Sequence, residues 1–446
     1  MKSKTFNFAL ICILLFPFSS AAGYILDFIP RFSITEEYSD NIFLAEEDEQ
    51  DDFITTISAA FKVEILGKFS GMNFSYDPSY AFYDDFSEND TLRHRGRLNA
   101  WTDLTNNTSL ELRDAFLRTE EPFTLEEISI VRGEEPLLPE DPTIRKKREP
   151  YYRNIADLRL NHQFGESDNF YLGYVYRILE NDDPDVEDKK RHSPSIGLNY
   201  WFTSQFGLET SASYTRGKYD KPDFADVPYE DDFDNWYGNI KLINKFSKYF
   251  EGYIQYAHTV RDFDERNTED YNVYDSSIGI NYAVAEDFNL TLGVGYFIQD
   301  RETSDDETGA IINADLGKTW RLKRGRVNIS GSSGYHQSDF GAENLGFEQF
   351  YKARFLAVYG LTKRITGDIN IYYRRDEYIN LEDNDREDET WRGGVGLTFK
   401  PLKWLSCKLK YSYRKVDSSE DYNDYAENRV FIRVTLSPSL PFRISQ

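Results

Sequence analysis

Residues 335–341, YHQSDFG, place His336 and Ser338 two positions apart, which puts both side chains on one side of a β-strand. A serine becomes a nucleophile when a histidine within hydrogen-bond reach removes its proton and a third residue orients that histidine. Asn344 is the one nearby candidate for this third role, and it does not stand at the expected distance. We therefore expect no enzymatic activity from this pair.

The other histidines, His94, His162, His192 and His258, are scattered along the chain without metal-ligand spacing. Acidic clusters such as residues 182–188, DDPDVED, offer oxygen ligands that suit hard cations. They could bridge divalent cations to an anionic lipid surface, but none has the spacing of a calcium loop. We favour the alternative that they are solvated charge runs, and we expect no metal and no cofactor.

The segments that would carry these residues alternate between apolar and polar positions. In residues 288–300, FNLTLGVGYFIQD, Leu292, Val294 and Ile298 fall on one face of a strand and Thr291 and Gln299 on the other. The same alternation recurs in SIGLNYWF, WRGGVGLTFK and RVFIRVTL. These runs last about ten to fourteen residues, longer than the usual five or six, and suit a tilted strand that crosses a hydrocarbon layer.

The connections between these segments fall into two alternating classes. One is short and neutral or basic, as in GKFSG from Gly67 and KPLKW from Lys400, and the other is longer and acidic, as in EEDEQDD from Glu46 and EDNDREDE from Glu382. Turns at one membrane face and loops at the other are typical of an up-and-down barrel. About ten long loops predict an all-β, transmembrane, antiparallel up-and-down β-barrel of about 18–20 strands, an even number.

The composition fits this fold class, with a formal charge of -25 beside 16% aromatic residues. Tyrosines recur near the predicted strand ends, where amphipathic rings prefer the headgroup level and form a girdle. Ordinary β-propensity in a soluble sheet is the alternative. The tyrosines that carry this prediction are Tyr176, Tyr214, Tyr256, Tyr296, Tyr335, Tyr373, Tyr378 and Tyr413.

The first 22 residues, MKSKTFNFALICILLFPFSSAA, have two lysines, an apolar run and a small-residue cleavage site near Ala22, which is the pattern of a secretory signal peptide. We therefore divide the chain into a signal peptide at 1–22 and an outer-membrane β-barrel at 23–446. Strands are expected to begin within about ten residues of the cleavage site, so we expect no plug domain.

The longest predicted loop covers residues 120–150 and contains a basic cluster, Arg145, Lys146, Lys147 and Arg148. Such a loop could fold into the lumen as a constriction, with these residues lining it. It could equally remain an outer loop, which we favour for a proline-rich and charge-rich segment.

The apolar face of each strand is expected to meet lipid and the polar face a water-filled lumen. Basic residues on the lumen face would favour anionic solutes, whereas pairing with acidic neighbours would only brace the wall, which we prefer for any single residue. The candidates are Arg177, Arg326, Arg374, Lys408, Lys410, Arg414, Arg429 and Arg433. The same alternation turns His336 and Ser338 into the lumen, away from lipid substrate, although the pair resembles that of outer-membrane phospholipases.

The segment EEYSDNIFL, residues 36–44, followed by DDFITTISAAF, residues 51–61, resembles the N-terminal signature of the putative β-barrel porin 2 family. The later strands and the closing ENRVFIRVTLS, residues 427–437, are similar as well. The resemblance implies a Gram-negative outer-membrane protein of a family often linked to exopolysaccharide or capsule export and without known catalytic residues.

Three functional hypotheses follow. The leading one is a porin-like channel for passive passage of a solute, with exopolysaccharide as one candidate. The alternatives are a structural or docking barrel with a closed lumen and, last, a lipid hydrolase. The expected partners are outer-membrane lipid and lipopolysaccharide, the barrel-assembly machinery and polysaccharide export components; no nucleic-acid partner is expected.

Overall fold

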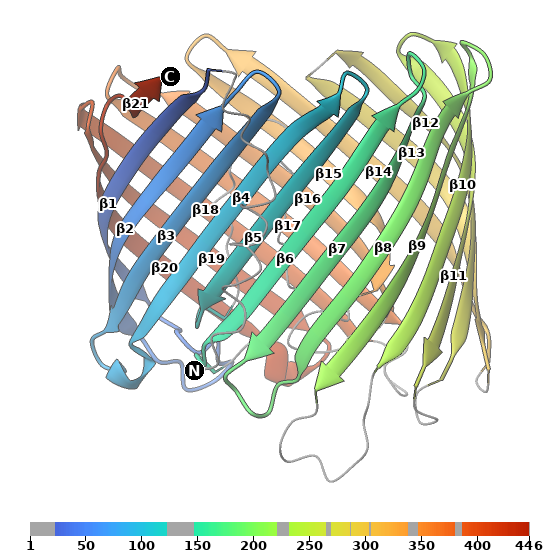
Figure 1. Ribbon diagram of the computed structural model, residues 1–446. Helices are drawn as coiled ribbons and strands as arrows, with labels where there is room; N and C mark the ends of the chain where they lie inside the picture. Colours follow the sequence, from blue (N-terminus) through green and yellow to red (C-terminus); the bar gives the residue numbers. More distant parts are fainter. Residues whose placement is uncertain are drawn as a thin grey trace.

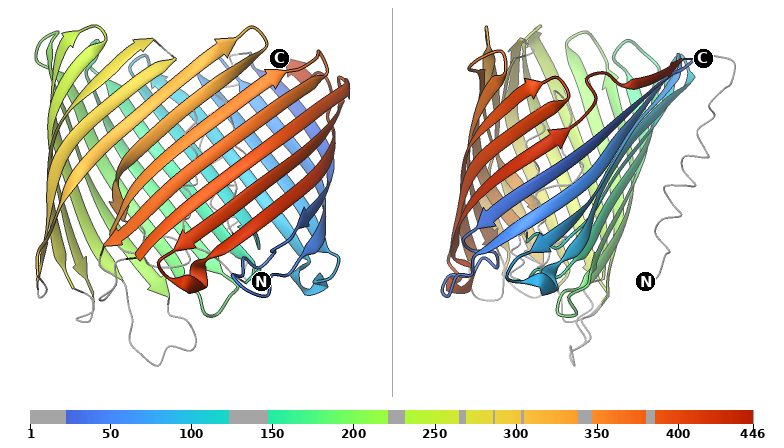
Figure 2. Two further views of the ribbon diagram at one scale, coloured as in Figure 1. Left: turned by 180° about the vertical axis from the view of Figure 1, so that it is seen from behind. Right: turned by 90° about the vertical axis from the view of Figure 1, so that its left-hand side faces the viewer.

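The computed structural model describes residues 23–122, 147–220, 232–264, 269–285, 287–302, 305–337, 347–379 and 386–445. These residues form one antiparallel sheet that closes on itself as a barrel of tilted strands (Figures 1 and 2). Strands β1 to β20 each pair with their neighbours in chain order. The predicted signal peptide and the pair of Ser338 and Asn344 lie outside the described residues.

The strands are long, most of them 13 to 16 residues. Their bounds are β1 Ile25–Ser39, β2 Asp52–Leu66, β3 Ser70–Tyr83, β4 Thr91–Thr105, β5 Thr108–Thr119, β6 Tyr151–Gln163, β7 Asn169–Asn181, β8 Asp188–Trp201, β9 Phe206–Asp220, β10 Phe233–Ser247, β11 Phe250–Phe263, β12 Tyr271–Ala285, β13 Phe288–Arg301, β14 Glu307–Leu322, β15 Gly325–Gln337, β16 Phe347–Gly360, β17 Ile365–Ile379, β18 Arg386–Leu402, β19 Leu405–Ser418, β20 Tyr425–Leu436 and β21 Phe442–Ser445.

The barrel closes between the first strand and the last two. β20 pairs with Phe32–Ser39 of β1, and β21 pairs with Ile25–Phe28 of the same strand. The two are separated by SPSLP, and proline cannot donate a ladder hydrogen bond. Because β20 and β21 share one position beside β1, the barrel has twenty strand positions, which confirms an even number at the upper end of the predicted range.

Short turns join the strands at one end of the barrel, which we call the turn end, and longer connections join them at the loop end (Figure 1). The C-terminal β21 lies at the turn end beside the start of β1. Two short 3-10 helices, Ser87–Asn89 and Asp421–Asn423, lie in loop-end connections. In the part of the chain that the structure describes, no helix is long and apolar enough to cross a bilayer.

The outer face of the barrel is apolar, as the alternation predicts. Leu292, Val294, Tyr296 and Ile298 of β13 are all exposed, and Val294 is 61% exposed. Exposed aromatic residues gather near the turn end: Phe69, Phe164, Phe202, Phe206, Phe246, Tyr249, Tyr359 and Trp404. An exposed apolar band bordered by aromatic rings is the surface that a bilayer covers.

Two of the predicted girdle tyrosines lie elsewhere. Tyr378 is 1% exposed and sits over Arg386 on the inner face. The Tyr335 hydroxyl donates to Asp275, 2.5 Å away, and its ring packs against Phe347. Both phenols therefore take part in packing at the loop end rather than in a membrane-facing girdle.

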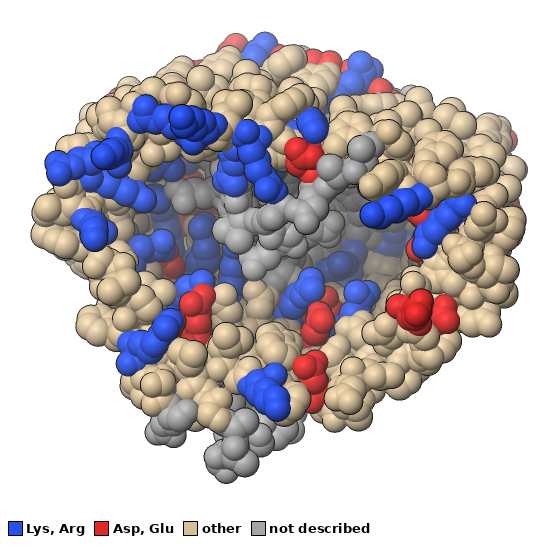
Figure 3. All heavy atoms as spheres, turned by 90° about the horizontal axis from the view of Figure 1, so that it is seen from above, with Lys and Arg blue, Asp and Glu red and all other residues tan. Residues whose placement is uncertain are grey.

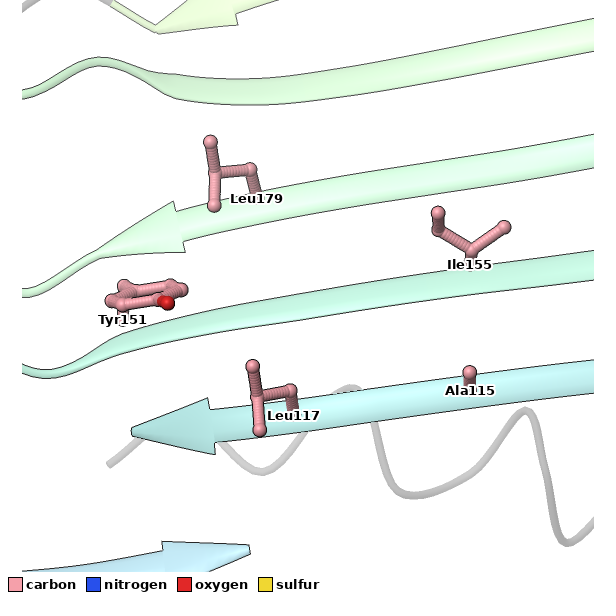
Figure 4. Close-up of a cluster of buried hydrophobic side chains, with 5 residues drawn as sticks. All are labelled: Ala115, Leu117, Tyr151, Ile155 and Leu179. Atoms are coloured by element: carbon pink, nitrogen blue, oxygen red, sulfur yellow. The ribbon is translucent and has the colours of Figure 1, made fainter. Parts of the chain in front are cut away.

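The inner face is not polar along its whole length. Ala115, Leu117, Tyr151, Ile155 and Leu179 share the inner face of β5, β6 and β7 near the loop end, where they form a buried apolar cluster (Figure 4). The prediction of a polar, water-filled interior is therefore wrong for the loop-end part of this wall. The outward-facing neighbours Phe116 and Tyr152 are half-buried, so the alternation continues to the strand ends, and it is the inward-facing positions that are apolar there.

Candidate channel lumen

Apolar clusters of this kind recur around the loop end, and we call them together the collar. Besides the cluster of β5–β7, the collar contains Leu44, Val416 and Tyr425; Ile42, Ile54, Ala81 and Tyr83; and Val273, Phe297, Ile311 and Phe347. The last group spans β12, β13, β14 and β16, and the rings of Phe297 and Phe347 lie 5.1 Å apart. The collar therefore narrows the inner space near the loop end.

The connection between β1 and β2 supplies part of the collar. Ile42 and Leu44 are fully buried, although they stand in a loop with acidic residues on both sides. Asn41 fixes this loop, because its side-chain Nδ2 donates to the carbonyl oxygens of Ala45 and Ala426 at 2.7 and 3.0 Å. The loop thus turns inward over the barrel wall instead of outward into solvent.

Beside the collar, a network of ion pairs joins the barrel closure to the ends of the longest loop; we call it the seam network. At its centre, Arg429 Nη1 lies 3.3 Å from Glu37 Oε1 and 3.2 Å from Glu121 Oε2. Its Nε also pairs with Glu427, which accepts a hydrogen bond from Ser39 Oγ at 2.7 Å. The network therefore holds β1, β20 and the segment after β5 together.

Arg93 and Arg148 extend the seam network. Arg93 pairs with Glu120 and with Glu121, the latter at 2.8 Å. Arg148, whose side chain is fully buried, donates from Nε to the Ile42 carbonyl at 2.7 Å and from Nη1 to the Tyr83 hydroxyl at 2.8 Å. Buried charges of this kind are stable only when they are paired and hydrogen-bonded.

Glu121, outside the strands, shows how strongly these charges are coupled. Burial alone would raise the pKa of its carboxyl group, but Arg93, Arg429 and Arg148 outweigh burial and hold the pKa well below the usual range of a glutamate. A depressed carboxyl pKa adds stability above the unfolded-state pKa, and this stability is lost only as the pH falls through the folded-state value. The Glu121 carboxylate is therefore charged at neutral and mildly acidic pH.

The predicted constriction residues fall into two groups. Arg145 and Lys146 lie outside the described residues. Lys147 is largely exposed and pairs with Asp185 and Asp183 at 2.5 and 3.3 Å, which raises the pKa of its ammonium group. Arg148 instead belongs to the seam network, so the structure gives these two neighbours different surroundings.

The eight predicted lumen-facing cations alternate along their strands with exposed apolar residues. Arg374 pairs with Glu348 and with Asp376, whose oxygen is 2.6 Å from its Nε. The Arg433 Nε donates to Thr35 Oγ1 at 2.9 Å, and Arg414 lies over the Tyr425 ring. Arg374 and Arg429 thus take part in wall-bracing ion pairs, as the alternative interpretation expects.

The remaining four cations lie on the inner face of the barrel, each directly opposite a residue of a neighbouring strand. Arg177 stands opposite Arg191, Arg326 opposite Val358, and Lys410 opposite Phe431. Lys408 stands opposite Arg433 on the neighbouring strand. In the described part of the chain, no group of three or more His, Cys, Asp or Glu side chains is arranged to hold a metal ion.

Seen from the turn end, the barrel is hollowed, and Lys and Arg side chains gather on the rim and on the inner wall (Figure 3). The lumen therefore has two zones. The loop-end zone is closed in by the collar and by paired buried charges, and the turn-end zone presents cationic and hydroxyl side chains. A wall of this composition can admit hydrated, and preferably anionic, solutes.

Comparison with known proteins supports the barrel assignment. A ferric enterobactin receptor from Pseudomonas aeruginosa is similar in fold, with a TM-score of 0.50 at 8% identity over 92% of this chain and 81% of that chain. The porin structures OccAB4 of Acinetobacter baumannii, at 13% identity, and OpdQ of Pseudomonas aeruginosa, at 15%, align with TM-scores of 0.37 and 0.36. They cover 93% and 92% of this chain and 98% of their own chains, and at these scores they support no further conclusion.

No curated protein matches the chain in sequence. The family described as putative beta-barrel porin 2 matches residues 245–437, from the end of β10 to the end of β20. This match indicates a porin-like β-barrel of the bacterial outer membrane rather than an enzyme. It confirms, for that part of the chain, the resemblance seen in the sequence to the putative beta-barrel porin 2 family.

Proposed function

We propose that the protein is a passive channel that lets a hydrophilic solute cross the outer membrane. The observation that carries this proposal is the closed barrel of twenty strand positions, apolar outside, with a hollow at the turn end lined by charged side chains. Short turns face the periplasm in barrels of this class. The hollow would then be the periplasmic entrance.

Exopolysaccharide is the finer candidate for the solute, on the strength of the family resemblance. The proposal includes the partners expected from the sequence: outer-membrane lipid and lipopolysaccharide around the barrel, the assembly machinery that inserts it, and polysaccharide export components at its periplasmic end. The apolar band and aromatic residues on the outer face support the contact with lipid.

A structural barrel with a closed lumen is the second candidate, and the collar favours it. The collar and seam network fill the loop end with buried side chains. The two candidates therefore differ in whether solute passes the collar of the native protein.

Liposome swelling with sugars of increasing size separates them. We expect proteoliposomes of the native protein to swell in small sugars, with a size limit set by the collar. The double variant Phe297→Ala/Phe347→Ala removes two facing rings from the collar and should raise both the rate and the size limit. A matched variant that truncates an outward ring, Phe246→Ala, should leave the rates unchanged.

The outcomes are distinct. Swelling in the collar variant but not in the native protein would mean that the collar closes the channel. No swelling in either protein, with heat-modifiable mobility showing that both are folded, would contradict the channel and favour the structural barrel.

A further inference from the structure

The inner wall of β15–β20 places cations directly opposite cations. Lys352 faces Arg374 across β16 and β17, Arg392 faces Arg414 across β18 and β19, and Lys408 faces Arg433 across β19 and β20. Directly opposed side chains lie about 5 Å apart at Cβ, and like charges there destabilise a sheet. Such pairs are expected where binding an anion matters more than wall stability.

The opposite wall follows the usual rule. On β10, Lys241 faces Glu209 of β9, and Lys245 faces Glu251 of β11. The Lys241 Nζ lies 3.6 Å from a Glu209 oxygen. Opposed cations also occur elsewhere, since Arg177 faces Arg191 across β7 and β8, but on β16–β20 three such pairs follow one another along a single wall.

Aromatic rings hold the cationic heads in place. Tyr372 lies between Arg354 and Arg392, whose guanidinium carbons are 5.6 and 5.0 Å from the ring centroid. Phe431 lies in the same way near Lys408 at 5.8 Å and Arg433 at 5.2 Å. A cation held over a ring is oriented by the interaction. The guanidinium and ammonium groups of these side chains therefore have defined positions on the wall.

The acidic side chains of this wall are concentrated at the loop end. Glu348 and Asp376 pair with Arg374, Asp388 pairs with Arg386, and Glu427 pairs with Arg429. Toward the turn end, the basic side chains outnumber the described acidic ones, of which Asp368 is an example. The adjoining turns continue the positive charge with Lys323, Arg324, Lys363, Arg364 and Lys403 (Figure 3).

Hydroxyl side chains interleave with these cations. By the ladder register, Ser332 faces Lys352, Ser330 faces Arg354, and Thr398 faces Lys408. Hydroxyls donate and accept hydrogen bonds without charge, as the hydroxyls of a sugar require, while guanidinium groups bind carboxylates in bidentate geometry. The combination suits a sugar chain that carries carboxylates.

We propose that the cations of this wall form a binding track for a carboxylated oligosaccharide, with Lys352, Arg354 and Arg392 about midway along their strands and Lys408 and Arg433 near the turn end. The track specifies a class of solute for the proposed channel, and its biological role rests on that proposed function. The positive turn end attracts the anionic chain, because clefts of one charge concentrate counter-charged solutes. Successive carboxylates then exchange between neighbouring cations along the wall.

Binding to the folded protein in detergent tests the track without requiring conductance. The probes are tri-galacturonate and the neutral trisaccharide maltotriose, measured by isothermal titration calorimetry at low and moderate salt. We expect tri-galacturonate to bind, more weakly as salt rises, and maltotriose not to bind detectably. The double variant Arg392→Gln/Lys408→Gln should lose roughly tenfold or more in affinity, since each lost charge-assisted contact weakens binding.

The matched control, Lys241→Gln/Lys245→Gln, removes the same charge from the opposite wall and should change the affinity by less than about twofold if binding is local. Equal losses in both double variants, equal binding of maltotriose, or no binding to the native protein would overturn the track. Binding of hexathymidylate as tight as that of tri-galacturonate would overturn the assignment to an acidic sugar. Failure of the channel itself would appear only as absent solute passage, with binding retained.

Discussion

Replacing Arg429 with glutamine is expected to lower the free energy of unfolding by about 3–5 kcal/mol, the range for removing one partner of a buried ion-pair network. Arg429 is in contact with Glu37, Glu121 and Glu427. Without its charge, three carboxylates remain close together in a buried region, and their repulsion adds to the lost attraction. The measurement is urea unfolding in lipid or detergent, followed by tryptophan fluorescence.

Arg375→Gln is the matched control for this prediction. Arg375 also pairs with two carboxylates, Glu377 and Glu387, but its side chain is 38% exposed on the outer face. Exposed pairs contribute about 0–1 kcal/mol, so this variant should be nearly as stable as the native protein. Equal destabilisation by the two substitutions would show that the seam network has no special role.

Replacing Val294 with arginine is expected to lower the free energy of unfolding by about 2–4 kcal/mol. Val294 lies in the middle of β13 on the apolar outer face, where a charge must leave water for hydrocarbon. The matched variant is Thr291→Arg on the inner face of the same strand, directly opposite Asp315 of β14. We expect that variant to fold normally.

Unfolding midpoints in liposomes measure both β13 variants. A Val294→Arg protein as stable as Thr291→Arg would mean that the exposed apolar face is not embedded in lipid. The comparison therefore tests the membrane assignment independently of any transport activity.

The strand pattern could be predicted from the sequence because one face of each strand meets a uniform apolar phase. The alternation of Leu292, Val294, Tyr296 and Ile298 fixes which residues face outward, and these are the residues that the structure exposes. The alternation of turns and loops also predicted the count of strands. Only the interruption at residues 437–441, which splits the last strand, was absent from that prediction.

The loop end could not be predicted in the same way because its contacts join residues far apart in the sequence. Ser39 and Glu427, for example, meet only because the first and last strands close the barrel. The apolar run Ile42–Leu44 between acidic residues was the one local signal of an inward-turning loop. A tyrosine such as Tyr378, which looks like a girdle residue in sequence, enters the lumen because its position in the alternation points inward.

The candidate site was predicted in part. Alternation identified basic residues such as Arg374 and Lys408, but not which of them meet carboxylates and which face other cations. That distinction depends on ladder register: Lys408 stands opposite Arg433 because β19 and β20 pair with that particular offset. Arg374 likewise pairs with Glu348 because the register of β16 and β17 places both on the inner face. The two side chains then meet diagonally across the two strands.

Single-channel recording of the refolded native protein in a planar bilayer is the most direct test of the central claim, that this barrel is a channel. We predict discrete, steady conductance steps, larger in the Phe297→Ala/Phe347→Ala variant, because this variant removes two inward rings from the collar. Silence in both proteins, with folding and insertion verified, would contradict it.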